Sequence, residues 1–284
     1  EPRARVVVRV TASLYAVYFG RQPERGRERS TACYQRLMTP DEATRAGDEA
    51  TPRERADAEH TDAESPVLAM QLAVRVDRTT PPTVTNICRA CALATIALLD
   101  DPRSQPGGPW HDPVAAWHQV HIRKLVRRGR GQAWQRAHDA PGVTVAIDDT
   151  EARAFVPGPV DNVHPSVAKL QIQSTELPAP PIAASLEPTP GLHIAVSPSV
   201  DMSWGKRAAQ CAHAAQRAWL TAPPYTLAAW ESTGRPIEVV QPSQELWAQL
   251  VDEASTHIHD GGYTEIPAGT LTTVAWWSAP VPTV

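Results

Sequence analysis

The sequence has few cysteines, no long hydrophobic run and only three lysines. Four cysteines are too few and too scattered for the disulfide framework of a small secreted domain, so we expect a reduced, cytoplasmic protein. No apolar run approaches the roughly 20 residues that a membrane-spanning helix needs. The net charge of −4 argues against attraction of nucleic acid by the whole molecule, so any such binding must come from local patches.

The first 66 residues carry the weakest pattern. Val6–Val10 and Leu14–Phe19 are apolar enough to form one strand each. The stretch from Arg21 to Glu64 is charged and poor in apolar residues, which predicts a poorly ordered extension over residues 1–66. We expect this extension to lie outside the working protein, with Met70 as a plausible first residue.

The rest of the chain shows the same order of predicted elements twice: strand, helix, strand, helix, strand. In residues 67–178 these are strand 68–76, helix 84–99, a basic strand 121–130, helix 132–138 and a hairpin of strands 143–147 and 152–156. In residues 191–284 they are strands 192–197, 237–241 and 270–277 with helices 205–220 and 244–254. A stiff Pro-rich linker, residues 179–190, joins the two units. We predict an α/β fold of two tandem three-layer α/β/α units, each a small mixed sheet flanked by helices.

The helix that begins near residue 204 has two unlike faces. At 3.6 residues per turn, Lys206, Gln210, His213 and Arg217 fall on one stripe. The opposite stripe is made of small or apolar residues: Ala208, Cys211, Ala212, Ala215 and Trp219. A cation in the first turn opposes the helix dipole at a cost of up to about 1 kcal/mol. Because lysine is rare in this chain, its presence there marks Lys206 as a candidate functional residue.

Two sequence blocks resemble the type-2 peptidyl-tRNA hydrolase family. Residues 205–214 read GKRAAQCAHA and resemble the family signature Gly-Lys-x-Ala-Ala-Gln-x-x-His-Ala. Residues 260–270 read DGGYTEIPAGT and resemble its Asp-Ala-Gly-x-Thr segment, which precedes a terminal apolar strand as it does here. The resemblance covers residues 191–284. It departs from the family at Gly261, where alanine is usual, and in strand 193–197, which lacks the common Arg-x-Asp ending.

The resemblance implies hydrolysis of the ester that joins a peptide to the 3′ end of tRNA, with peptidyl-tRNA as partner. Asp260 would position the water, and Lys206 would stabilise the oxyanion or the 3′-terminal phosphate. Thr264 would orient Asp260 or bind the substrate, and His213 would act as a supporting partner. No metal or other cofactor is required. Family members usually pair as homodimers, which two units in one chain would replace by an internal pseudo-dimer.

The first unit has none of the motif residues at the matching places, so we expect a degenerate, catalytically silent hydrolase-like repeat. Its basic run, residues 123–130, is the clearest nucleic-acid candidate, with Arg127, Arg128 and Arg130 as substrate contacts. The alternative is an edge strand protected by charge. In the second unit, Gln210 and Gly262 are further candidate substrate contacts, and Trp204 suits stacking on the terminal adenine.

Other patterns have simpler interpretations. Cys88-x-x-Cys91 lies in a helical pattern without a second pair, which favours buried helix cysteines over a zinc or redox site. His118-x-x-His121 has ligand-like spacing without a further ligand, so a metal site is the weaker interpretation. His257-x-His259 is more typical of strand or loop structure, with substrate contact as the weaker alternative.

Two rival functions remain open on sequence alone. The second unit is either a hydrolase or a catalytically inactive RNA- or protein-binding module on the same scaffold. Occupation of the Lys, Gln, His, Asp and Thr positions favours the hydrolase. Esterase or amidase action on a small molecule is disfavoured, because the chain lacks a nucleophilic Ser or Cys motif.

Overall fold

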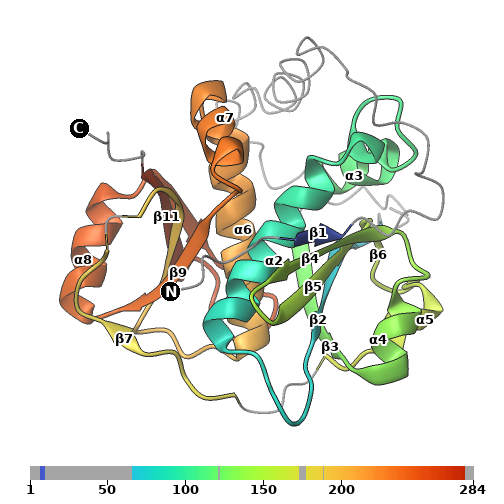
Figure 1. Ribbon diagram of the computed structural model, residues 1–284, viewed down its shortest axis with the longest axis horizontal. Helices are drawn as coiled ribbons and strands as arrows, with labels where there is room; N and C mark the ends of the chain where they lie inside the picture. Colours follow the sequence, from blue (N-terminus) through green and yellow to red (C-terminus); the bar gives the residue numbers. More distant parts are fainter. Residues whose placement is uncertain (1–6, 10–65, 121, 173–176, 188, 279–284) are drawn as a thin grey trace, which may run out of the picture.

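The computed structural model describes residues 7–9, 66–120, 122–172, 177–187 and 189–278. It is mixed α/β, with two mixed sheets flanked by helices (Figure 1), which confirms the predicted fold class. Within these residues, no helix is both long enough and apolar enough to cross a bilayer.

The first sheet has the strand order β1-β4-β5-β2-β3, with β6 beside β2. β2 runs parallel to β3 and antiparallel to β5, which forms a hairpin with β4. The strands are β1 (Val7–Arg9), β2 (Leu68–Arg75), β3 (Arg123–Gly129), β4 (Gly142–Ile147), β5 (Thr150–Phe155) and β6 (Gly158–Pro159). The helices of this unit are α2 (Val84–Leu99), η2 (Pro102–Ser104), α3 (His111–His118), α4 (Gly131–Ala137) and α5 (Pro165–Ala168).

The second sheet has the strand order β10-β11-β8-β9-β7. β8 runs parallel to β9 and antiparallel to β11, which pairs antiparallel with β10. The strands are β7 (Ile182–Ala183), β8 (Gly191–Val196), β9 (Ile237–Pro242), β10 (Thr256–His259) and β11 (Leu271–Ser278). The helices are α6 (Trp204–Thr221), α7 (Pro224–Ser232) and α8 (Gln244–Glu253).

The two sheets share one topology. Strands β4, β5, β2 and β3 match β10, β11, β8 and β9 in order and in relative direction. In each unit a pair of helices separates the two parallel strands along the chain, and a further helix precedes the antiparallel pair.

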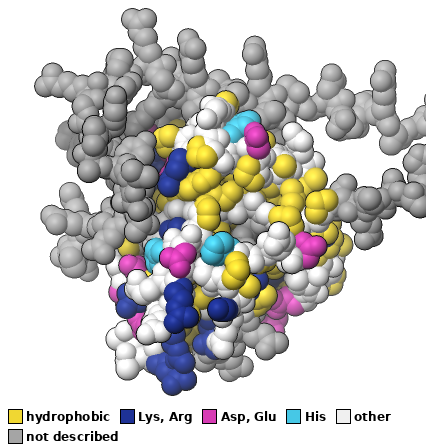
Figure 2. Space-filling view, turned by 90° about the vertical axis from the view of Figure 1, so that its right-hand side faces the viewer, with side chains coloured by type: hydrophobic (Ala, Val, Ile, Leu, Met, Phe, Trp, Pro, Cys, Tyr) yellow, Lys and Arg dark blue, Asp and Glu magenta, His cyan; other side chains and the backbone are white. Residues whose placement is uncertain are grey.

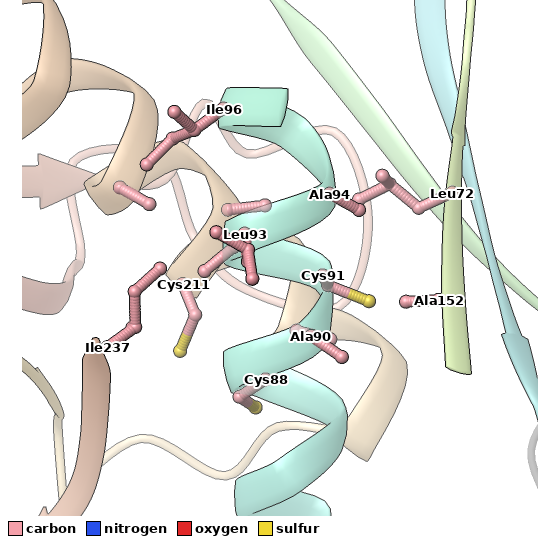
Figure 3. Packing of buried hydrophobic residues seen from close by; sticks show 14 of the residues in the cluster. Leu72, Cys88, Ala90, Cys91, Leu93, Ala94, Ile96, Ala152, Cys211 and Ile237 are labelled. Carbon is pink, nitrogen blue, oxygen red and sulfur yellow. The ribbon is translucent and has the colours of Figure 1, made fainter. Parts of the chain in front are cut away.

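Helices α2 and α6 pack against each other between the two sheets (Figures 1 and 3). Besides its own sheet, α2 contacts β9, and α6 contacts β3. In Figure 3, Cys91 and Ala94 of α2 point toward Ala152 and Leu72 of the first sheet, while Cys211 of α6 lies on the other side of α2. One continuous core therefore includes residues of both units. Nearly every residue of α2 is buried because the second unit covers the side that the first sheet leaves open.

Smaller apolar clusters fill the outer faces of the sheets. Trp134, Phe155 and Leu170 pack between the first sheet and helices α4 and α5. Leu250 packs against Val274 between the second sheet and α8. Each sheet thus has helices on both faces, with α2 and α6 forming a middle layer that the two units share.

Most helices and strands agree with the sequence patterns, but some helices and short strands were not predicted. The predicted helix 84–99 coincides with α2, and the other predicted helices and strands fall within a few residues of α4, α6, α8 and the main strands. Helices α3 and α7 were not predicted, and β7 lies inside the predicted linker and pairs with β9. Of the predicted extension, Val7–Arg9 pairs with β4 as a strand. The remainder of residues 1–65, including the predicted strand 14–19, lies outside the described residues.

Candidate functional site

Helix α6 begins at a serine cap that is tied to the loop preceding β11. Oγ of Ser203 accepts a hydrogen bond from the backbone N–H of Lys206 at 3.2 Å and donates to Glu265 Oε1 at 2.8 Å. The backbone N–H of Ser203 also donates to Glu265 Oε2, at 3.3 Å. Glu265 therefore joins the two sequence blocks and places a negative charge at the positive end of the helix dipole.

The loop after β10 holds Asp260 in a fixed position. Its backbone N–H donates to Thr270 O at 2.9 Å, and its carbonyl accepts from the N–H of Gly269 at 2.8 Å. Oδ1 of Asp260 accepts from the N–H of Gly262, also at 2.8 Å. Gly262 has φ +77°, and a Cβ there would meet Ala268 Cβ at 2.7 Å, so this turn requires glycine.

Lys206, Asp260 and Thr264 meet at one point. Nζ of Lys206 lies 2.5 Å from Asp260 Oδ2 and donates to Thr264 Oγ1 at 2.8 Å. The carboxylate is almost fully buried and the lysine side chain is 13% exposed. The ion pair explains why a cation is tolerated in the first turn of α6: its partner is a buried charge from the adjacent loop.

Gln210 makes a second contact with the same carboxylate. Its Nε2 donates to Asp260 Oδ2 at 2.7 Å, while its Oε1 accepts from the hydroxyl of Thr272 at 2.8 Å. Because a carboxylate can only accept, the N–H of the Gln210 amide faces Asp260 and its oxygen faces the Thr272 hydroxyl. Sequence reasoning missed Thr272 and Ser203; the only available signal was their place at the start of β11 and immediately before α6.

This arrangement suits acyl-ester chemistry. Two side-chain donors, Lys206 and Gln210, and the backbone N–H of Gly262 hold Asp260 in place, and a carboxylate held in this way can orient a water. Lys206 has three N–H groups, of which Asp260 and Thr264 accept two. The third is available to a developing oxyanion or a phosphate oxygen.

His213 lies on the same stripe of α6 and contacts the first unit. Nζ of Lys124, on β3, lies 3.1 Å from His213 Nδ1 and also donates to Gln216 Oε1. Nε2 of Gln216 lies 2.8 Å from His118 Nε2. Burial first, and then the charges of Lys124 and Lys206, lower the pKa of His213 well below its ordinary value, so the imidazole is neutral at physiological pH.

Two of the predicted substrate contacts are buried in the structure. Trp204, the first residue of α6, is only 7% exposed and belongs to the shared core, which leaves little of its ring accessible for stacking on a base. Arg127 is also 7% exposed and donates from Nε to Gln71 Oε1 at 2.8 Å and from Nη1 to Leu170 O at 3.1 Å. Its guanidinium is part of the first unit's interior.

The remainder of the basic run has mixed exposure. Arg128 is half-buried, and Arg130, the N-cap residue of α4, is exposed. β3 is an edge strand of its sheet, yet its even-numbered residues Lys124 and Val126 face α6 and are buried. On the face carrying α4 and α5, Lys and Arg side chains gather in the lower half of Figure 2 and hydrophobic side chains in the upper half.

The candidate metal and cysteine motifs have structural surroundings. Cys88 and Cys91 are buried in α2, as predicted. His257 Nε2 lies 2.8 Å from Val251 O, which connects β10 to α8, and His259 is exposed. His121 lies outside the described residues. No group of three or more His, Cys, Asp or Glu side chains in the described ranges is arranged to hold a metal ion.

A groove of about 600 Å³ lies elsewhere, between α7 and the ends of β8 and β11. Its lining is largely apolar and includes Tyr225, Trp230, Trp276 and Trp277. Glu253 is the only carboxylate in its lining, and none of the predicted site residues reaches it. The candidate site at the start of α6 is therefore separate from this groove.

Fold and site together define a mixed α/β unit with a buried Lys–Asp pair at the start of a strand-to-strand crossover. Residues 191–284 match the family model described as "Peptidyl-tRNA hydrolase PTH2". The match covers the chain from β8 to β11 and includes both sequence blocks, and it does not extend into the first unit. No curated protein matches the chain.

Proposed function

We propose that this chain hydrolyses the ester bond of peptidyl-tRNA, or of N-blocked aminoacyl-tRNA, releasing tRNA and peptide. One observation carries the proposal: Lys206 from the first sequence block lies at hydrogen-bond distance from Asp260 and Thr264 of the second block. The family match over residues 191–284 supplies the substrate class. In this proposal the protein acts in translation, in the cytoplasm.

In the proposed reaction, Asp260 orients a water toward the ester carbonyl. Lys206 donates its third N–H to the carbonyl oxygen as that oxygen becomes negative. Thr264 holds the ammonium in place, and Gln210 with the N–H of Gly262 holds the carboxylate. An ester of tRNA is already activated, so no covalent nucleophile is needed. Asp260 takes a proton from the water as its oxygen adds to the carbonyl carbon, and that proton passes to the ribose oxygen as the C–O bond to the ribose breaks.

The first unit belongs to the proposal as a diverged copy of the second. The shared strand order and the reciprocal contacts of α2 with β9 and α6 with β3 support an internal pseudo-dimer. In that copy, the positions that carry chemistry in the second unit are not occupied by the same residue types. Its proposed contribution is contact with tRNA phosphates through Arg128 and Arg130.

Deacylation of N-acetyl-aminoacyl-tRNA tests the function directly. We expect release of the blocked amino acid by the wild-type chain and a loss of about a hundredfold or more in Lys206→Ala and Asp260→Ala. Arg217→Ala removes an exposed cation on the same helix and should leave the rate unchanged. Near-normal cleavage by either site variant would overturn the assigned roles.

The rival proposal is an inactive RNA- or protein-binding module on this scaffold. A wild-type chain that binds N-blocked aminoacyl-tRNA without cleaving it would favour this rival. The complete Lys–Asp–Thr–Gln set argues against it, because a buried ion pair costs desolvation free energy that a pure binding surface does not require.

A further inference from the structure

The first unit reaches the candidate site at two adjacent residues of β3. Lys124 contacts His213 on α6. The guanidinium of Arg123 lies 4.1 Å from the ring centre of Tyr263, in the loop between Asp260 and Thr264. The start of β3 therefore touches both sequence blocks that make up the site.

Lys124 is unusual because it is buried without a carboxylate partner. It is 7% exposed, its Nζ lies 5.0 Å from the ring centre of Trp117, and no salt bridge to it is found among the described residues. Its polar neighbours are Gln216 Oε1 and His213 Nδ1. Burial of a lysine without a carboxylate partner lowers the free energy of unfolding, and these two hydrogen bonds offset only part of that cost.

The hydrogen bonds determine which way the protons face. Gln216 Nε2 donates to His118, so the amide oxygen of Gln216 faces Lys124 and accepts from it. Nζ of Lys124 has at least two protons in either charge state, and the second faces Nδ1 of His213. Burial lowers the pKa of Lys124, and the lowered pKa of His213 keeps the ring neutral.

Nε2 of His213 has no hydrogen-bond partner among the described residues, and the ring is half-buried. It lies on the stripe of α6 that carries Lys206 and Gln210, close enough for the Lys206 charge to act on it. A neutral imidazole that accepts at Nδ1 carries its proton at Nε2. It therefore presents one donor on the side of the site.

We propose that Lys124 of the first unit is a positioning residue for the site. It donates to Nδ1 of His213 and fixes the imidazole with its proton on Nε2, which donates to an oxygen of the bound ester. The inference rests on the proposed hydrolase function. It makes the first unit necessary for full activity even though that unit lacks the catalytic motifs.

The test compares Lys124→Met with a matched variant at the same interface. Methionine keeps the length of the stem and its contact with Trp117 but removes the amine. We expect kcat on N-acetyl-aminoacyl-tRNA to fall about ten- to a hundredfold with KM nearly unchanged. The matched variant is Arg89→Met. Nε of Arg89, in the first unit, donates a hydrogen bond to Ile237 O of the second unit at 2.7 Å. This variant also removes a cation from the interface, and we expect its kcat to stay unchanged.

A double variant tests whether Lys124 acts through His213. If it does, Lys124→Met added to His213→Ala changes kcat no further. Equal losses in Lys124→Met and Arg89→Met, or independent effects of the Lys124 and His213 changes, would overturn the proposal.

Nitrogen NMR of the His213 ring separates this inference from the hydrolase function. In the wild-type chain we expect ¹⁵N shifts of a neutral ring protonated at Nε2, and in Lys124→Met a shift toward a mixture of tautomers. This readout needs no turnover, so it holds even where the wild-type chain fails to cleave the ester. A wild-type His213 protonated at Nδ1 refutes the proposal, including in the case where Lys124→Met does not fold.

Discussion

Nζ of Lys206 and Oδ2 of Asp260 lie 2.5 Å apart, with side chains 13% and 3% exposed. Such a pair is costly to break, because removal of one partner leaves the other buried and charged. Three donors surround the carboxylate, so it retains two of them when Lys206 is changed.

A double-mutant cycle on this pair measures that cost. We expect Lys206→Met and Asp260→Asn each to lower the free energy of unfolding, by an amount near the lower end of about 3–5 kcal/mol. The double variant should lose less free energy of unfolding than the two single losses added together, by about 1–3 kcal/mol. Urea denaturation of the four proteins provides the values, and strictly additive effects would contradict a direct ion pair.

Two glycines of the loop before β11 distinguish the cost of a left-handed backbone from the cost of a steric clash. Gly262 and Gly269 have φ of +77° and +80°, but only at Gly262 would a Cβ meet a neighbour, Ala268, at 2.7 Å. Gly269→Ala should cost about 1–2 kcal/mol for the left-handed conformation alone. Gly262→Ala should cost more and also lose ester cleavage, because the N–H that holds Asp260 Oδ1 moves. Equal losses of stability and rate in the two variants would disprove this difference.

The free energy of unfolding should fall in acid because of His118. Burial, with a contribution from Lys124, lowers the pKa of His118 from 6.5 to about 4. The unfolded chain therefore binds the proton more tightly, so stability from His118 is complete above pH 6.5 and is lost as the pH falls from 6.5 to about 4. Since the ring is only half-buried, we expect about 1–3 kcal/mol from this group.

His118→Asn provides the comparison for the acid effect. Its free energy of unfolding, measured by urea denaturation from pH 7 to pH 4, should vary less with pH than that of the wild-type chain. An identical pH dependence in the two proteins would mean that His118 titrates normally.

The two arginines Arg127 and Arg130 should differ in effect. Arg130→Gln removes an exposed charge and should weaken tRNA binding while reducing the slope of log K against log salt by about 1. Arg127→Gln removes the bonds to Gln71 and Leu170 O and should mainly lower thermal stability. Filter binding over a range of salt concentrations, with thermal unfolding of both variants, tests this. A larger salt effect from Arg127→Gln would reverse the assignment.

Motifs predicted the second unit better than local patterns predicted the basic strand. Lys206, Asp260 and Thr264 were expected to meet, and they do so because α6 and the loop before β11 lie at the same end of the second sheet. Trp204 and Arg127 were expected at the surface, and both are buried. A residue's type and strand alternation do not reveal which neighbouring element covers its face.

The sequence by itself determined the long elements, because helical and alternating periodicity follow from the covalent geometry of the chain. It also determined the residue types of the site. Only the tertiary structure decided that α2 and α6 form one shared layer, and that Lys124 and Arg123 of the first unit contact His213 and Tyr263 of the second. Those contacts join residues far apart in the chain. They form because α2 and α6 bury their apolar faces against each other, which brings the two units together.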